Sequence, residues 1–462
     1  MHDLDRKTRE ALWRRVGELV EGHVATLEAR PLVPAVPDVA RAPWPEDAPQ
    51  EPLALVDAAF HALESGTVAV DHPRYFGLFN TAPAVLAVVA DALVSTLNPQ
   101  LATRSHAPGP VAAEEGLLRD LGERFGWARE EARGAFTSGG GEANLTALLC
   151  ALHAAFPEVG ARGVRAITGT PRVYVSAEGH ATIARAARVA GLGAEAVRIV
   201  PADANCRMKT TALREAIAKD RAAGDAPFLV VATAGTTSTG AIDPIEEIAA
   251  IAERSGLWFH LDAAWGGLAA LVPELRGAIA GAARADSITF DPHKAMAVPL
   301  GTGALLVRHA GLLERVFADR SGYMPREGSG DPYARSLPWS RRFLGLRVIL
   351  PLAAAGWDGY AASLRTQLAL ADRLRDGLRA RGWRLVNDTP LPVVCFVDAD
   401  RRDGRFLDTV ARAVIAARGG WISVPRFANG TRALRACVNS HRTTNADIDM
   451  LLDELDRARE AA

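Results

Sequence analysis

Lysine is scarce in this sequence. Of the 53 Lys and Arg residues only Lys7, Lys209, Lys219 and Lys294 are lysines. The first three lie in polar stretches, where a solvated lysine is expected, but Lys294 lies between apolar runs in "SITFDPHKAMAVPL" (287–300). An amine, unlike a guanidinium, can lose its proton and attack a carbonyl, and burial favours the neutral form. Lys294 is therefore a candidate nucleophile, with a lysine that snorkels at a strand end as the alternative.

The sequence is also poor in cysteine and has no long apolar run. Cys150, Cys206, Cys395 and Cys437 are far apart and form no CxxC pair, so neither a disulfide framework nor a metal site is predicted. No apolar run reaches the length of a membrane-spanning helix, and the charged, amphipathic N-terminus is unlike a signal peptide. A net charge of −1 does not favour binding to nucleic acid or to an anionic membrane. We expect a cytoplasmic protein with a small-molecule substrate.

The N-terminal part of the sequence predicts a helix followed by an extended arm. Residues 4–28 carry apolar side chains at helical spacing. Residues 30–52 contain seven prolines, too many for a helix or a central strand. Because a leading helix followed by such an arm has little to pack on in its own chain, we expect both to contact a second subunit.

From about residue 80 to 310, short β-branched runs alternate with helical stretches, which predicts a largely parallel sheet covered by helices. Ligands of such sheets bind at the carboxyl ends of the strands. The predicted strands are 172–176, 196–200, 228–234, 257–264, 287–290 and 303–308.

The chain after residue 355 predicts a small α+β domain. Its expected elements are helices at 358–380, 405–417 and 444–459 and strands at 392–398, "WISV" (421–424) and "ALRACV" (433–438). We therefore divide the chain into an N-terminal helix and arm (1–80), a large domain (81–355) and a small C-terminal domain (356–462).

Polar groups lie at the ends of several predicted strands. The glycine-rich turn "TSGGGEAN" (137–144) opens a helix whose N-terminal amides suit a phosphate, although a plain helix start has the same pattern. His180 opens another helix, where it is placed to stack on a flat ring, to exchange protons near neutral pH, or simply to cap the helix. Thr236 and Thr237 follow a strand and are candidate ligands of phosphate oxygens.

Asp262 follows the apolar strand in "WFHLDAAWGG" (258–267). A buried carboxylate is costly unless it meets a cation or hydrogen-bond donors, although a turn or capping aspartate is the alternative. Taken together, these groups and Lys294 suit a phosphate, a planar ring, a ring cation and an aldehyde. Pyridoxal 5′-phosphate (PLP) contains all four.

The motifs, in this order and spacing, resemble those of the group II PLP-dependent amino-acid decarboxylases of the aromatic-L-amino-acid decarboxylase type. The resemblance runs from "HPRYFGLFN" (72–80) through "DPHK" (291–294) to "LRACVNSHRTT" (434–444). It implies the PLP-dependent transferase fold type I, an α/β fold with a mostly parallel sheet, an N-terminal helical arm and a small C-terminal α+β domain. It also implies a homodimer that converts an L-amino acid, with an aromatic one favoured, to its amine and CO₂.

The resemblance assigns roles to individual residues. Lys294 forms the Schiff base with the cofactor, His180 stacks on its ring, and Asp262 pairs with the protonated ring nitrogen. Ala264 lies against the ring, and the phosphate is held by Gly140, Gly141, Thr237 and His293.

A tyrosine on the loop before "RRF" is expected, by the same resemblance, to return a proton to Cα after CO₂ leaves. Tyr333 is the first candidate and Tyr323 the second, and either is alternatively a surface-loop residue. Asp291 departs from the family pattern, because many relatives have Asn there, and "AMAVPLGTG" replaces the usual Trp-Leu after the lysine.

Three aromatic residues, Phe76, Phe79 and Trp265, are candidates for the substrate pocket or for the core. Cleavage of a C–C bond, transamination and decarboxylation coupled to oxidation use the same ring and lysine, so the sequence leaves them open. A non-catalytic homologue that binds PLP is a further alternative, but such a protein is expected to have lost at least one of Lys294, Asp262 and His180.

Overall fold

A seven-stranded sheet forms the centre of the larger part of the molecule. The computed structural model describes residues 3–34, 49–318, 330–401 and 403–462. The strand order is β1-β7-β6-β5-β4-β2-β3. The strands are β1 (Arg133–Thr137), β2 (Pro171–Ser176), β3 (Val197–Val200), β4 (Ala226–Thr233), β5 (Trp258–Asp262), β6 (Ser287–Phe290) and β7 (Gly303–Val307).

The prediction of a mostly parallel sheet is confirmed, with β7 as the exception. β7 pairs antiparallel with both β6 and β1, while β2, β3, β4, β5 and β6 pair in parallel. A parallel return needs a crossover, usually a helix. The connection 291–302 contains only the four-residue α11 (Pro292–Ala295), so the chain turns back beside β6.

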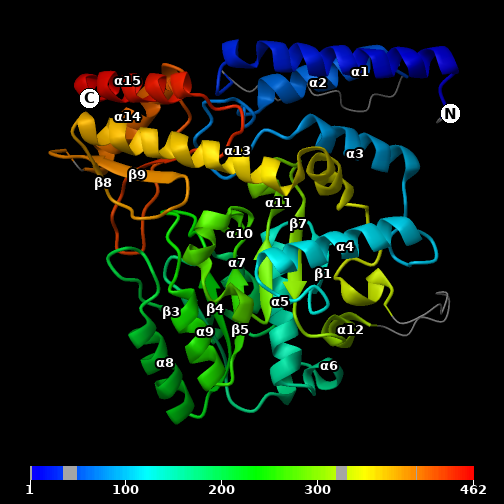
Figure 1. Cartoon of the computed structure of the whole chain (residues 1–462), viewed down its shortest axis with the longest axis vertical. Helices are drawn as coiled ribbons and strands as arrows, with labels where there is room; N and C mark the ends of the chain where they lie inside the picture. The colour runs from blue at the N-terminus through cyan, green and yellow to red at the C-terminus, as the bar shows by residue number, and fades with distance from the viewer. Residues whose placement is uncertain (1–2, 35–48, 319–329, 402) are drawn as a thin grey trace.

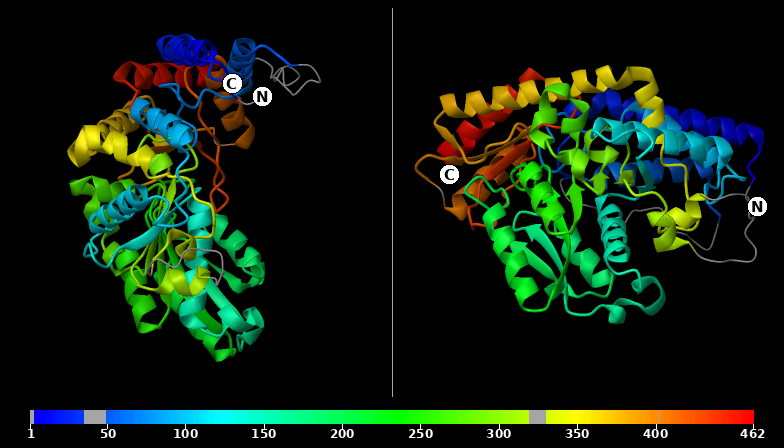
Figure 2. Two further views of the ribbon diagram at one scale, coloured as in Figure 1. Left: turned by 90° about the vertical axis from the view of Figure 1, so that its right-hand side faces the viewer. Right: turned by 60° about the horizontal axis from the view of Figure 1, so that its bottom comes forward.

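Helices cover both faces of this sheet, because its strands are apolar on both sides. One face packs against α4 (Pro108–Arg124), α8 (Thr210–Ala222) and α9 (Ile245–Arg254). The other packs against α5 (Gly140–Ala155), α7 (Thr182–Val189) and α12 (Leu312–Phe317). The large sheet lies at one end of the molecule, and the C-terminal part lies at the other (Figures 1 and 2).

A three-stranded antiparallel sheet, ordered β10-β9-β8, forms the C-terminal part. The predicted strand "WISV" is wrong, since Trp421 and Ser423 make only isolated bridges. The predicted helix at 358–380 is confirmed, and an earlier helical segment from Leu346 joins it across a break at Gly356 (φ 67°, ψ 172°), next to the expected domain boundary. That boundary stays a prediction. The elements are α13 (Leu346–Ala380), β8 (Trp383–Leu385), β9 (Val393–Asp398), α14 (Gly404–Ala416), β10 (Leu434–Cys437) and α15 (Asn445–Ala461).

The N-terminal helix α1 (Arg6–Thr26) packs against a second helix, α2 (Pro52–Gly66), which the sequence did not predict. Proline is tolerated at the first position of a helix, so Pro52 begins α2 rather than extending the arm. The expectation that the first helix lacks a partner in its own chain is therefore wrong. Residues 35–48 of the proline-rich segment lie outside the described residues.

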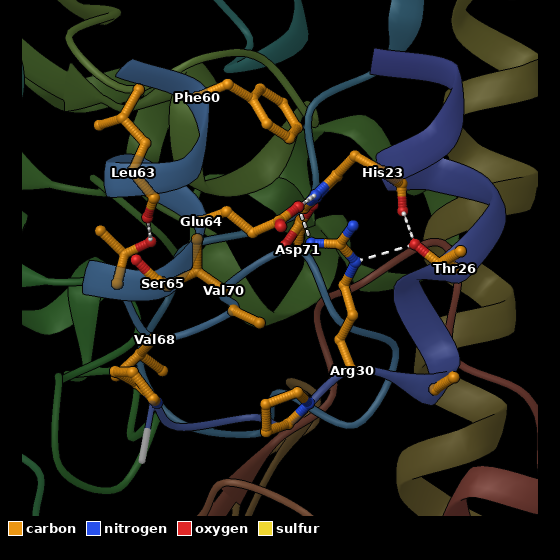
Figure 3. Close-up of a pocket in the computed structure, with 15 residues that line it drawn as sticks. His23, Thr26, Arg30, Phe60, Leu63, Glu64, Ser65, Val68, Val70 and Asp71 are labelled. Carbon is orange, nitrogen blue, oxygen red and sulfur yellow. Dashed lines mark hydrogen bonds and ion pairs between the residues drawn. The ribbon is translucent and has the colours of Figure 1, made fainter. Parts of the chain in front are cut away.

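Charged side chains join α1 to α2 and to the turn after it (Figure 3). His23 Nδ1 lies 3.2 Å from Glu64 Oε1, and His23 Nε2 lies 2.7 Å from Asp71 Oδ2. Arg30 pairs with the same Glu64. These contacts surround a cavity of about 740 Å³. α1 itself buries no residue in a single chain.

The helix α3 (Val85–Leu97) packs on α13 through Ala87, Ala90 and Val94 and exposes apolar side chains on its other side. We call this exposed set the α3 apolar face. No helix in the ranges that the structure describes is both long enough and apolar enough to span a membrane. The α3 apolar face consists of Val85, Leu86, Val88, Val89, Leu93 and Leu97, which are 40% to 78% exposed.

Candidate active site

A pocket of about 230 Å³ opens at one edge of the large sheet. The carboxyl ends of β1, β2, β4, β5 and β6 meet there, since these strands all run in one direction. The sequence segments singled out above each contribute to its wall. The lining residues are Phe79, Ser138, Gly139, Gly140, Gly141, Asn144, His180, Thr182, Thr233, Gly235, Thr237, Asp262, Ala264, Trp265, Asp291, His293 and Lys294.

Glycines at the start of α5 leave space for an anion. A Cβ atom at Gly140 would lie 3.0 Å from Asp291 Oδ2 and 3.4 Å from Ala264 Cβ, so a side chain would fill this cradle. The N-terminal amides of a helix attract negative charge. Thr237 lines the pocket. Thr236 does not, because its side chain is fully buried and its hydroxyl bonds to that of Thr239.

Lys294 lies in α11, directly after β6, and its Nζ is 2.9 Å from Asp291 Oδ2. Asp291 is 1% exposed. Apart from this contact with Lys294, the Asp291 carboxylate accepts no hydrogen bond from the residues that the structure describes. The two side chains therefore form an ammonium–carboxylate pair inside the pocket.

His293 lies beside this pair, with its Nε2 3.8 Å from Asp291 Oδ2. Its Nδ1 is 2.9 Å from the Thr302 carbonyl oxygen, which can only accept, so Nδ1 carries a proton. Burial lowers the pKa of His293, which favours the neutral ring.

Asp262 ends β5 and is nearly buried. Its Oδ2 accepts a hydrogen bond from Asn144 Nδ2 at 2.9 Å, and its Oδ1 accepts one from the Ala264 N–H at 3.2 Å. Hydrogen bonds to a carboxylate stabilise its ionised form. Asp262 is thus prepared to pair with a cation in the pocket.

His180 lines the pocket and remains exposed to solvent. Its Nδ1 accepts a hydrogen bond from the Thr182 N–H at 3.3 Å, which leaves the proton on Nε2 in the neutral ring. Desolvation by the surrounding protein lowers the pKa of His180, while the Asp262 carboxylate opposes this shift.

Tyr333, the first candidate for the proton donor, is not brought to the pocket by the structure. It lies in a 3₁₀ turn (Pro332–Arg335), its ring packs on Trp339 at 4.5 Å between centroids, and its N–H donates to the Ala102 carbonyl. Its role as a proton donor stays a prediction. Tyr323 lies in 319–329, outside the described residues.

Two of the three candidate aromatic residues line the pocket. Phe79 and Trp265 stack with ring centroids 4.2 Å apart. Phe76 does not reach the pocket, because it is fully buried in the core of the C-terminal part.

Two residues that the sequence analysis missed belong to this region. Asn144 lies one helical turn after Gly140 on the same face of α5, a spacing that could have identified it. Arg435 is 2% exposed, and its guanidinium lies 4.8 Å from the Phe79 ring. Its Nε and Nη2 have no hydrogen-bond partner among the residues that the structure describes. Nothing in a sequence so rich in arginine distinguishes Arg435, because its burial depends on the fold.

The pocket suits PLP and shows no sign of a metal site. The glycine cradle, the hydrogen-bonded Asp262 carboxylate and Lys294 match the phosphate, the ring cation and the aldehyde of PLP, in that order. Among the residues that can be placed, no group of three or more His, Cys, Asp or Glu side chains is arranged to bind a metal ion.

Comparisons with known proteins agree with this site. Residues 37–398 match the pyridoxal-dependent decarboxylase conserved domain. The cysteine sulfinic acid decarboxylase of Mus musculus is 32% identical over 412 residues, which cover 84% of this chain and 83% of that protein. The acidic amino acid decarboxylase of Homo sapiens is 31% identical over 412 residues, which cover 84% and 78%.

A solved structure shares the fold. The structure of Oryza sativa TDC with PLP and tryptamine has a TM-score of 0.93 at 22% identity and covers 100% of this chain and 99% of that one. With a family match over most of its length and a pocket that fits the cofactor, the chain belongs to the pyridoxal-dependent decarboxylase family and is a PLP-dependent amino-acid decarboxylase.

Proposed function

We propose that the enzyme converts an L-amino acid to its amine and CO₂, and that Lys294 is the residue that bonds to the cofactor aldehyde. The observation that carries this proposal is the position of the Lys294 amine in one pocket with the glycine cradle and Asp262. When bound, PLP supplies an electron sink for the pair left by the departing carboxylate.

The residues of the chain prepare the pocket for that chemistry. The N-terminal amides of α5 would bind the phosphate, and the Asp262 carboxylate, which accepts two hydrogen bonds, would pair with the protonated ring nitrogen. The Lys294 amine must give up its proton before it can attack a carbonyl. Asp291 Oδ2, at 2.9 Å, is placed to take that proton.

Borohydride reduction tests the role of Lys294. The reduced holoenzyme should carry the cofactor on the peptide that contains Lys294, as seen by peptide mass spectrometry. Lys294→Ala should carry none, and Lys209→Ala, which removes a lysine far from the pocket motifs, should behave like the parent. A borohydride-stable adduct in Lys294→Ala would overturn the assignment.

For the substrate, we propose an aromatic L-amino acid. The stacked Phe79 and Trp265 form an apolar end of the pocket, and apart from Lys294 no Lys or Arg of the described residues lines it. An acidic amino acid is the second candidate. It is supported by the cysteine sulfinic acid and acidic amino acid decarboxylases to which the chain is similar. It is also supported by the buried Arg435 guanidinium beside Phe79, which donates from Nη1 to the Gly77 carbonyl but makes no hydrogen bond through Nε or Nη2 within the described residues.

A substrate panel separates these candidates. Phe, Tyr, Trp and DOPA would be compared with Glu, Asp and cysteine sulfinate by kcat/KM for CO₂ release, with amine, aldehyde and peroxide measured as products. Amine from the aromatic set supports the proposal, and activity confined to the acidic set rejects it. Aldehyde with peroxide would indicate decarboxylation coupled to oxidation, and amino-group transfer or C–C cleavage without CO₂ would contradict decarboxylation.

We also propose that the enzyme is a homodimer, because the α3 apolar face and the exposed apolar side chains of α1, such as Trp13 and Val24, are costly to leave in water. A second copy of the chain would cover both. A cytoplasmic location is likewise proposed, since the four cysteines are free and buried, as expected in a reducing compartment.

A further inference from the structure

A line of buried polar side chains runs from Asp262 into the sheet. Asn144 on α5 contacts Asp262, and His260 on β5 contacts Asn144. Ser287 on β6 contacts His260, and Trp258 on β5 contacts Ser287. Each of these five residues is at most 8% exposed. Buried polar groups are costly unless each has its partner, so the line has a definite arrangement.

The Asp262 carboxylate fixes the orientation of the Asn144 amide. An ionised carboxylate only accepts hydrogen bonds, so the Asn144 atom 2.9 Å from Asp262 Oδ2 is the NH₂ nitrogen. The Asn144 oxygen therefore faces His260 Nε2 at 3.0 Å and also accepts from the Thr289 hydroxyl at 2.8 Å. A flipped amide would place its oxygen against the carboxylate.

The amide orientation in turn fixes the tautomer of His260. Since the Asn144 oxygen cannot donate, His260 Nε2 carries the proton. The Ser287 carbonyl oxygen, 3.1 Å from Nδ1, would suit a proton on that nitrogen, but burial lowers the pKa of His260 and so disfavours a ring protonated on both nitrogens. With Nε2 protonated, Nδ1 therefore accepts. The Ser287 hydroxyl donates to Nδ1 at 2.8 Å and itself accepts from Trp258 Nε1–H at 2.9 Å. Every donor in the line thus points toward Asp262.

We propose that His260 is a positioning residue which, through Asn144, keeps the Asp262 carboxylate directed at the ring nitrogen of the cofactor. Hydrogen bonds that all run in one direction polarise one another, which strengthens the last bond, to Asp262. This inference rests on the proposed pairing of Asp262 with the ring nitrogen. The alternative is that the line only ties α5 to β5 and β6.

Two forms of the cofactor distinguish these roles. The dissociation constants of PLP and of its analogue with carbon in place of the ring nitrogen would be measured with the apo forms of the parent and of His260→Phe. The analogue keeps the aldehyde and the phosphate, so only the ring-nitrogen contact differs. Residues that orient a direct ligand typically contribute about 10-fold to 100-fold in affinity. We expect a loss of that size for PLP and less than about threefold for the analogue.

In His260→Phe, an equal loss of affinity for PLP and for the analogue, or no loss of affinity for PLP, would overturn the positioning role. If the parent itself binds PLP and the analogue equally, the pairing by Asp262 fails instead, which is a separate result. Ser287→Ala removes only the hydroxyl that donates to His260 and is a milder second variant. It should shift the PLP-to-analogue ratio in the same direction by less, and an unchanged ratio would contradict the proposal even if His260→Phe does not fold.

Discussion

Placing two carboxylates on the α3 apolar face should separate the proposed dimer into monomers. Val89 and Leu93 lie one helical turn apart and are 43% and 46% exposed. Full burial of a Val or Leu side chain stabilises a fold or an interface by about 1.5–3 kcal/mol. Because nearly half of each residue is exposed, covering it with a partner should contribute about 1 kcal/mol to dimer stability. A two-fold interface counts each position twice. Val89→Asp/Leu93→Asp should therefore cost about 4 kcal/mol, or about 10³-fold in the dissociation constant, before the cost of burying unpaired charges is added.

Light scattering after size-exclusion chromatography, over a range of concentrations, measures this change. The parent should have twice the 49.0 kDa mass of one chain, and the double variant should have the mass of one chain. Met450→Asp places the same charge on an isolated exposed apolar residue, 41% exposed on α15, and should remain a dimer. A double variant with the dissociation constant of the parent would show that the α3 apolar face is not the interface.

Three further predictions concern single residues. Asp243 accepts hydrogen bonds from the Met208 and Thr233 N–H groups, and burial raises its pKa to about 7. The folded chain thus holds this proton more tightly than the unfolded chain, so stability from this group is greatest below about pH 4 and falls as pH rises to 7. In urea unfolding, the free energy of unfolding of Asp243→Asn should rise relative to that of the parent by about 2–3 kcal/mol between pH 5 and pH 7. A difference between the two proteins that does not change with pH would refute this. Asp262→Ala should keep some cofactor, measured by absorbance, but lose most turnover, and full turnover would mean that another group serves the ring nitrogen. Tyr333→Phe should bind substrate normally and form amine about 10²–10⁴-fold more slowly, with part of the product as aldehyde, and unchanged amine formation would exclude this hydroxyl as the proton donor.

The sequence predicted best where a short motif and the end of a strand coincide. Gly140, Asp262 and Lys294 each stand directly after an apolar run, and parallel strands must bring their carboxyl ends together. The pocket could therefore be assembled from local pattern alone. Their chemical roles rest on the resemblance and the proposals above.

Features that depend on contacts between distant segments were not predictable in this way. The direction of β7 depends on how far the connection 291–302 can reach, which alternation of strands and helices does not show. His260 and Asn144 look like ordinary residues of a strand and a helix until the fold places them 3.0 Å apart. The helix α2 was missed because the prolines before it concealed its start.

The antiparallel return of β7 also affects the order in which the site can form. β1 leads into the glycine cradle, yet its strand partner is β7, which follows Lys294 in the chain. A Cβ atom at Gly303, the first residue of β7, would lie 2.5 Å from Gly139 Cα and 2.7 Å from Asp291 Oδ1, so β7 closes directly on the cradle. Pairing of segments so far apart in sequence is entropically costly and slow. On the ribosome, β1 therefore has no strand partner until β7, which ends at residue 307, has emerged, and the ability to hold PLP should be acquired late, when β7 joins the sheet.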